Sequence, residues 1–425
     1  MVANEPETNT RAWVLHPDIK SDNQRRDPGF ALAEAVALAE AMPWLDIVGA
    51  DVVSLPKMKP GLLFGTGKVD ELKRKFEAED VELVLVDGPL TPVQQRNLEK
   101  EWGVKILDRT GLILEIFSDR ARTREGVLQV EMAALSYQRT RLVRAWTHLE
   151  RQRGGLGFVG GPGETQIESD RRAIDDAIVR LRRQLGKVVK TRELHRAARA
   201  KVPFPVVALV GYTNAGKSTL FNHLTGADVF VQDMLFATLD PTMRAVKLPS
   251  GRDVILSDTV GFISDLPTQL VASFRATLEE VLDADLILHV RDISHPQTHE
   301  QKQDVLAILD MLGIAEDAPM IEIWNKIDLT EDVVREGLET RAASKDDVYT
   351  ASALTGEGMS VLLDAVSDAV EVAKTSRELR LSFADGRKRA WLFGEEVVES
   401  EVQDEEGWLL QVRWTARQEK HYRDL

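Results

Sequence analysis

A glycine-rich segment at residues 211–218, Gly-Tyr-Thr-Asn-Ala-Gly-Lys-Ser, limits the folds open to this chain more than any other feature. An apolar run, 204–210, precedes it, and a helix-like segment, 218–224, follows it. A strand, a glycine-rich turn and a helix in this order form a phosphate-binding loop, whose backbone N–H groups surround a polyphosphate. Lys217 would contact the β- and γ-phosphates, and Ser218 would bind Mg²⁺. We therefore expect an α/β domain with a mainly parallel sheet and helices on both faces.

A second motif, Asn325-Lys326-Ile327-Asp328, indicates which base the site accepts. It follows another apolar run, 320–324. Guanine presents two N–H donors on one edge, and the carboxylate of Asp328 can accept both. Adenine would leave that acceptor unpaired, at a cost of about 1–3 kcal/mol. The motif therefore favours GTP over ATP, and the backbone of a later segment would complete the base pocket, Ser352-Ala353-Leu354.

Two segments between these motifs are candidates for sensing the γ-phosphate. The first is Asp258-Thr259-Val260-Gly261, in which Asp258 would hold Mg²⁺ through a water molecule. The N–H of Gly261 would reach the γ-phosphate because no Cβ blocks it. The second segment, 236–242, carries two hydroxyls, of which one would close over the metal. We favour Thr238, with Thr242 as a turn residue beside Pro241, although the sequence supports the two almost equally.

Phe262 stands directly after Gly261, where Ras-like proteins place a glutamine that orients the attacking water. A phenyl ring has no donor or acceptor for that task. The alternative is that Phe262 is simply a packed aromatic residue. In either case the water lacks its usual polar partner. We predict slow intrinsic hydrolysis, accelerated by a partner that reorders these segments or supplies a group.

Composition restricts the setting in which the chain works. It has 425 residues and no cysteine, which excludes disulfides and thiolate metal sites and suits a reducing compartment. Its first residues lack the basic flank and apolar core of a secretory signal, and no apolar run approaches about 18 residues. We expect a cytoplasmic protein without an integral membrane segment, a peripheral membrane-associated fraction being left open.

Charge is distributed unevenly along the chain. The net charge is −15, which argues against unspecific binding of DNA or other polyanions by the whole molecule. Residues 120–199, however, carry 18 Lys and Arg against 9 Asp and Glu. This basic segment is either the solvated face of long helices or a surface for an anionic partner.

Periodicity divides the chain into four parts. Residues 1–120 alternate strand-like and helix-like stretches, which predicts a small α/β domain. Residues 121–200 show two long helical patterns with heptad-like apolar spacing, which predicts an arginine-rich antiparallel hairpin. Residues 203–374 would form the GTPase domain, and residues 376–425 a small βαββ module.

Two glycine-rich segments outside the phosphate loop need an interpretation. The hairpin loop, 154–163, contains six glycines and has arginines on both sides. It could adapt to an irregular anionic partner such as folded RNA, or be a plain linker. Gly65-Thr-Gly67-Lys68 fails the spacing of a second phosphate loop, because Leu62 and Val69 stand where Gly and Ser or Thr are needed. It could still form an anion site at the start of a helix.

Four motifs together resemble the HflX family of ribosome-associated GTPases: those at 211–219, 236–242 and 258–262, and Gly-Gly-Pro-Gly-Glu-Thr-Gln at 160–166, the most family-specific of the four. The resemblance covers about residues 11–370. It implies a factor that binds the large ribosomal subunit and its rRNA, places the hairpin loop near the peptidyl transferase centre, and splits or rescues stalled ribosomes under stress. We expect a monomer. ATP binding by the amino-terminal domain stays open.

Carried over by position, the resemblance implies a defined set of nucleotide contacts. Lys217, Thr238 and Gly261 would act in catalysis, with Ser218 and Thr238 as Mg²⁺ ligands. The GTP-binding residues would be Gly211, Tyr212, Thr213, Asn214, Ala215, Gly216, Lys217, Ser218, Thr219, Phe236, Ala237, Thr238, Leu239, Asp240, Asp258, Thr259, Val260, Gly261, Asn325, Lys326, Asp328, Ser352, Ala353 and Leu354.

Two other functions compete with a GTPase switch on the ribosome. One is an RNA-stimulated nucleotidase that remodels RNA, and the other is a GTP-regulated scaffold for protein partners. Hydrolysis stimulated by large subunits alone, by any RNA, or by neither distinguishes the three.

Overall fold

The computed structural model describes residues 9–22, 26–152, 162–199, 204–226, 235–236, 242–264, 281–315, 318–372, 374–404 and 407–423. The chain forms two compact units. The first consists mainly of residues before 188 and also includes Phe236, and the second consists mainly of the residues from 188 onward.

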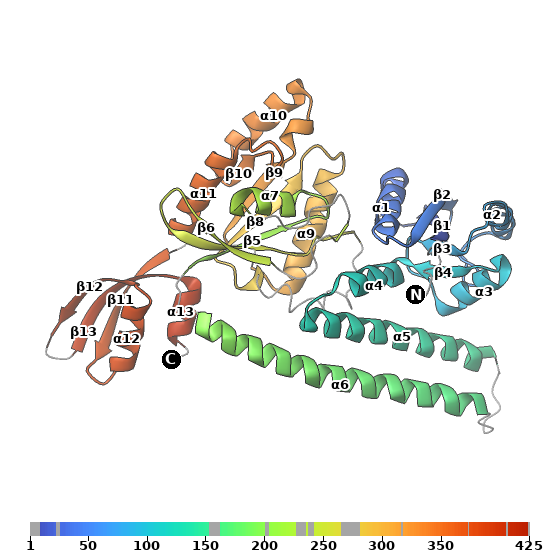
Figure 1. The fold of residues 1–425 in the computed structure, drawn as a ribbon, viewed down its shortest axis with the longest axis horizontal. Coiled ribbons are helices and arrows are strands. Elements are labelled where there is room, and N and C mark those ends of the chain that lie inside the picture. Colours follow the sequence, from blue (N-terminus) through green and yellow to red (C-terminus); the bar gives the residue numbers. More distant parts are fainter. Residues whose placement is uncertain are drawn as a thin grey trace, which may run out of the picture. The chain divides into compact units, whose positions relative to one another are not determined.

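The first unit begins with a parallel sheet in the order β2-β1-β3-β4 (Figure 1). Strands and helices alternate, as predicted for a small α/β domain. The helices start at defined signals: Asp27 caps α1, and Thr91 with Gln94 forms a capping box on α3. The elements are β1 (Thr10–Ile19), α1 (Pro28–Glu40), β2 (Leu45–Leu55), α2 (Thr66–Ala78), β3 (Leu83–Val86), α3 (Pro92–Trp102), β4 (Lys105–Asp108) and α4 (Arg109–Arg120).

Two long helices follow, α5 (Arg124–Gln152) and α6 (Pro162–Arg199), and they run side by side in opposite directions (Figure 1). Leu128 of α5 and Ile178 and Leu181 of α6 are buried, as the apolar spacing predicts. An ion pair between Arg139 of α5 and Asp175 of α6, at 2.9 Å, links the two helices. The last two residues of the predicted loop, 162–163, already belong to α6, because proline suits the first turn of a helix. Residues 153–161 lie outside the described residues.

Asp108 attaches the hairpin to the first sheet. This buried carboxylate at the end of β4 caps α4 by accepting the Gly111 N–H at 2.9 Å. It also accepts the Tyr137 hydroxyl at 2.5 Å and the Arg141 guanidinium at 2.8 Å, both from α5. Burial raises the pKa of Asp108, and Arg141 and the Gly111 N–H oppose that rise. One side chain therefore joins a strand end, a helix start and a second helix.

The second unit holds a sheet in the order β10-β9-β8-β5-β7-β6, in which β6 alone is antiparallel among the described strands. Ile321 and Ile323 of β9 pack with α7 and α11, while Trp324 packs with α10, so helices cover both faces. The elements are β5 (Val206–Gly211), α7 (Lys217–Thr225), β6 (Thr242–Lys247), β7 (Asp253–Asp258), β8 (Leu286–Asp292), α9 (Thr298–Leu312), β9 (Met320–Asn325), η1 (Ile327–Leu329), α10 (Asp332–Ala343), β10 (Val348–Thr350) and α11 (Met359–Val372). The expected fold class is confirmed.

The carboxyl-terminal module is an antiparallel sheet in the order β11-β13-β12 with two helices. The structure adds a closing helix, α13, to the predicted βαββ pattern. Its start has a local signal that the prediction missed: Thr415 and Gln418 exchange capping hydrogen bonds at 3.0 and 3.3 Å. The elements are β11 (Lys374–Ser382), α12 (Gly386–Gly394), β12 (Val398–Gln403), β13 (Gly407–Thr415) and α13 (Ala416–Arg423). Within the described part of the chain, no helix is long and apolar enough to span a membrane.

Candidate guanine-nucleotide site

The phosphate loop connects β5 to α7, as predicted, at the carboxyl edge of the parallel sheet. Two glycines allow close approach of neighbouring groups. A Cβ at Gly211 would lie 2.2 Å from the Val290 carbonyl oxygen, and one at Gly216, with φ of +91°, would lie 2.2 Å from the Asn325 side chain. Any larger residue would therefore displace β8 or the base motif. Asn214, between them, adopts φ of +57°.

Lys217 is buried, and its ammonium group is held against the loop. It donates hydrogen bonds to the carbonyl oxygens of Gly211 at 3.1 Å and Tyr212 at 2.8 Å. Burial lowers the pKa of Lys217 to about 8, against the opposing attraction of Asp258. The negative charge of a phosphate at this position would stabilise the protonated form of Lys217, which burial disfavours.

Ser218 and Asp258 lie together at the ends of α7 and β7. The Ser218 hydroxyl donates to Asp258 Oδ2 at 2.8 Å. A hydroxyl beside a carboxylate is an oxygen donor set that fits Mg²⁺, which takes few protein ligands and several from phosphates and water.

The segment after Asp258 lies directly against the phosphate loop. The Thr259 hydroxyl donates to the Leu209 carbonyl at 2.6 Å. A Cβ on Gly261 would be 3.0 Å from Lys217 Nζ, so this glycine is a direct neighbour of the lysine. Phe262 is fully buried, and its backbone forms an isolated parallel β-bridge with Tyr212. Its resting role is therefore that of a packed aromatic residue.

Asn325 joins the phosphate loop to the base-binding segments. Its amide donates to the Ala215 carbonyl at 2.8 Å and accepts the Ala353 N–H at 2.9 Å. Lys326, with φ of +64°, forms an ion pair at 2.8 Å with Asp292 at the end of β8. The bridging role of Asn325 and the pair with Asp292 were missed from the sequence. The aspartate that ends the apolar run of β8 was the available signal.

The remaining base residues lie around the same edge of the sheet. Asp328 is half-buried in η1. Ser352 is fully buried, and its hydroxyl accepts the Thr355 N–H at 3.1 Å. Leu354 is 78% exposed, so it can cover a bound base without rearrangement of the core. The other predicted contacts lie in three places: Thr213 in the phosphate loop, Thr219 in the first turn of α7, and Val260 in the segment after Asp258.

The predicted metal-closing segment is described only in part. Ala237, Thr238, Leu239 and Asp240 lie outside the described residues. Phe236 is buried, has φ of +58°, and packs edge to face on Phe117 of α4 with 4.7 Å between ring centres. Thr242 was expected in a turn. Instead it begins β6 and lies opposite Asp258, because β6 pairs in antiparallel fashion with β7 along its whole length.

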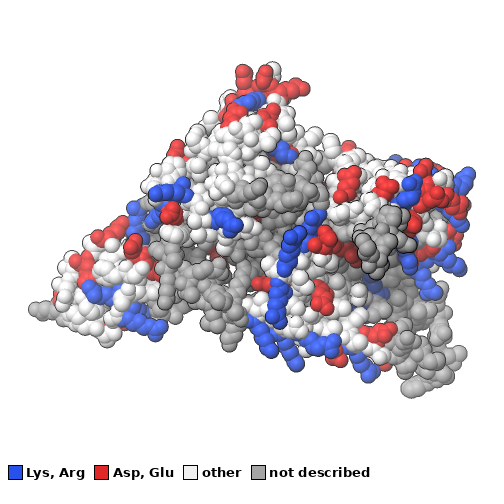
Figure 2. Space-filling model, viewed as in Figure 1, with Lys and Arg blue, Asp and Glu red and all other residues white. Residues whose placement is uncertain are grey.

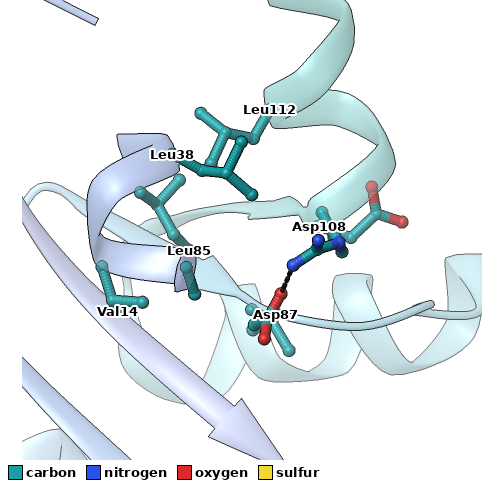
Figure 3. Close-up of a pocket in the computed structure, with 9 residues that line it drawn as sticks. Val14, Leu38, Leu85, Asp87, Asp108 and Leu112 are labelled. Atoms are coloured by element: carbon teal, nitrogen blue, oxygen red, sulfur yellow. Dashed lines mark hydrogen bonds and ion pairs between the residues drawn. The ribbon is translucent and has the colours of Figure 1, made fainter. Parts of the chain in front are cut away.

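The first unit contains a small cavity at the carboxyl ends of β3 and β4, beside Val14 in the middle of β1 (Figure 3). Arg109 forms an ion pair there with Asp87 at 2.6 Å and another with Glu34 at 2.5 Å, and Asp87 also contacts His16 at 2.8 Å. Burial alone would raise the pKa of Asp87, but Arg109 and His16 lower it below the usual value. A volume of about 10 Å³ matches one water molecule. This cavity is too small for ATP.

The segment Gly65 to Lys68 offers no better nucleotide site. It opens α2 without a side-chain cap, and Lys68 forms an ion pair with Glu71 of the same helix at 2.7 Å. Lys59 Nζ lies 3.8 Å from where a Cβ on Gly65 would be, and an anion site at this helix start stays a prediction.

Four features at one sheet edge define a P-loop GTPase: a strand, a glycine turn bearing a buried lysine, an Asp258–Ser218 pair and an Asn-Lys-x-Asp motif. Family models match successive parts of the chain: GTP-binding GTPase N-terminal at 30–118, GTP-binding GTPase Middle Region at 120–199, 50S ribosome-binding GTPase at 206–326 and HflX C-terminal domain at 337–423.

Named relatives agree with these models. The GTPase HflX of Magnetococcus marinus is 51% identical over 394 residues, which cover 93% of this chain and 88% of the relative. The GTPase HflX of Escherichia coli is 44% identical over 355 residues, 83% of each chain. The chain therefore belongs to the HflX family of GTPases, and it is a GTP-binding, GTP-hydrolysing enzyme.

Proposed function

We propose that this protein binds the large ribosomal subunit and its rRNA in the cytoplasm and splits or rescues stalled ribosomes under stress. The observation that carries the proposal is the combination of a guanine-nucleotide site with a long basic hairpin in one chain. Arg171, Arg172, Arg180, Arg182, Arg183 and Lys187 are all exposed on α6. Figure 2 shows Lys and Arg gathered along this helix. Such a face suits the phosphate backbone of RNA.

The nucleotide would act as a switch. Lys217 would hold the β- and γ-phosphates, Gly261 would donate its N–H to the γ-phosphate, and Asp328 would read guanine. Ser218 and Thr238 would ligate Mg²⁺, which neutralises the phosphate charge. If the GTP form prefers a large-subunit surface that overlaps the small-subunit contact, differential affinity separates the subunits. Hydrolysis then releases Thr238 and Gly261 and resets the factor.

Hydrolysis measured in three conditions tests the proposal: in buffer, with naked ribosomal RNA, and with intact large subunits. We expect slow turnover alone and stimulation only by subunits. Stimulation by any RNA would instead support an RNA-remodelling nucleotidase. If neither RNA nor subunits stimulate hydrolysis, a GTP-regulated scaffold for protein partners would be the remaining function.

A loop deletion tests the role of the glycine-rich hairpin loop separately from nucleotide binding. Removal of residues 155–160 should leave GTP affinity unchanged and abolish splitting of intact ribosomes, followed by light scattering. Splitting at the wild-type rate by the shortened protein would show that the glycine-rich loop has no part in the reaction.

A further inference from the structure

Tyr212, the second residue of the phosphate loop, contacts the segment that follows Gly261. Its side chain is buried, and its hydroxyl oxygen accepts a hydrogen bond from the Ser264 backbone N–H at 2.8 Å. A phosphate loop contacts its ligand through backbone N–H groups, so phosphate binding by itself does not require a hydroxyl at this position. The hydroxyl instead serves a contact between two segments.

Two backbone hydrogen bonds also join the phosphate loop to the segment after Gly261, and we call this set of contacts the junction. The Thr213 N–H donates to the Phe262 carbonyl at 2.7 Å, and the Phe262 N–H donates to the Gly211 carbonyl at 3.1 Å. Three hydrogen bonds thus join residues 262–264 to the loop. The bond to Tyr212 is the one among these three that uses a side chain, and so the one that a substitution can remove.

The junction begins directly after Gly261. A Cβ on Gly261 would be 3.0 Å from Lys217 Nζ and 2.8 Å from Thr213 Cγ2. The glycine is therefore beside the ammonium group that would bind the γ-phosphate. A donor that is ordered in advance loses less entropy when its ligand binds.

We propose that Tyr212 is a positioning residue that holds Gly261 next to Lys217, so that the γ-phosphate meets an ordered N–H donor. The inference rests on the proposed role of Gly261. It predicts that Tyr212 affects the affinity for GTP and leaves the affinity for GDP unchanged, because GDP has no γ-phosphate.

Tyr212→Phe removes the hydroxyl and keeps the ring. In the full-length protein we expect the affinity for a non-hydrolysable GTP analogue to fall about fivefold, as for one lost hydrogen bond, with unchanged GDP affinity. The Ser264 amide should also exchange its hydrogen faster in the unliganded variant. Ser264→Ala keeps the backbone N–H, and should retain the wild-type ratio of the two affinities.

Equal loss of GDP and analogue binding in Tyr212→Phe would overturn the proposal, since it would show a general role in the loop. An unchanged or higher analogue affinity would also overturn it. Gly261→Ala tests the underlying assumption separately. If that variant binds the analogue as well as the wild type does, the role of Gly261 is wrong, whatever Tyr212 does.

Discussion

Lys217 is a buried charged residue of the phosphate loop, placed where it would meet a nucleotide. The loop surrounds its ammonium group with carbonyl oxygens at 2.8 and 3.1 Å, yet burial still lowers its pKa to about 8. A free protein near pH 8 therefore contains lysine in both protonation states. Phosphate binds the protonated state, and its negative charge raises the pKa again.

Nucleotide affinity should depend on pH through this residue. Above about pH 8 the unliganded lysine loses its proton, so GDP binding must take one up and the affinity should fall as pH rises, by at most about tenfold per unit. Calorimetry at pH 8.5 in buffers of different ionisation enthalpy would detect the proton uptake. Affinity independent of pH from 7 to 9.5 would contradict the lowered pKa.

At the scale of elements, Asp108 determines how the hairpin is attached to its domain. The carboxylate is 3% exposed and serves the start of α4 together with Tyr137 and Arg141 of α5. Arg139 and Asp175, by contrast, are 43% and 41% exposed. The hydrogen bonds of the buried Asp108 should contribute more to stability than the exposed Arg139–Asp175 ion pair, because water competes with the exposed pair.

Asp108→Ala should lower the opening free energy of the α5 amides by about 2 kcal/mol, since it removes the acceptor of the Tyr137 hydroxyl and one of the acceptors of the Arg141 guanidinium. Arg139→Ala should change it by less than about 1 kcal/mol. Native-state hydrogen exchange measures both values. Equal effects of the two variants would refute the assignment of Asp108 as the main attachment point.

For the whole molecule, positive charge is concentrated in one segment of an otherwise acidic chain. The chain carries a net charge of −15, but its residues 120–199 carry 18 Lys and Arg against 9 Asp and Glu. An acidic molecule with one basic helix face should approach RNA in a preferred orientation, and salt should weaken that approach.

Replacement of Arg180, Arg182 and Arg183 by glutamate should lower affinity for large subunits at least about tenfold and flatten its dependence on salt concentration. GDP affinity should not change, because these side chains are exposed on α6. Co-sedimentation at several salt concentrations gives the slope. A variant that binds subunits with the wild-type slope would exclude this face from the interface.

The sequence alone was sufficient for the identity and order of the motifs. Phosphate and base recognition use short contiguous segments, so the glycine turn with Lys217 and the Asn325–Asp328 segment can be read without a fold. The two α/β sheets and the helical pair follow from local periodicity as well.

Only the tertiary structure decided which groups meet. Asn325 contacts Ala215, Tyr212 contacts Ser264, and Asp108 contacts Arg141, across 110, 52 and 33 residues of chain respectively. These contacts depend on which strands are neighbours: the order β10-β9-β8-β5-β7-β6 brings the ends of β5, β7 and β9 to one edge. Strand order is set by packing between distant segments, and no local pattern of residues records it.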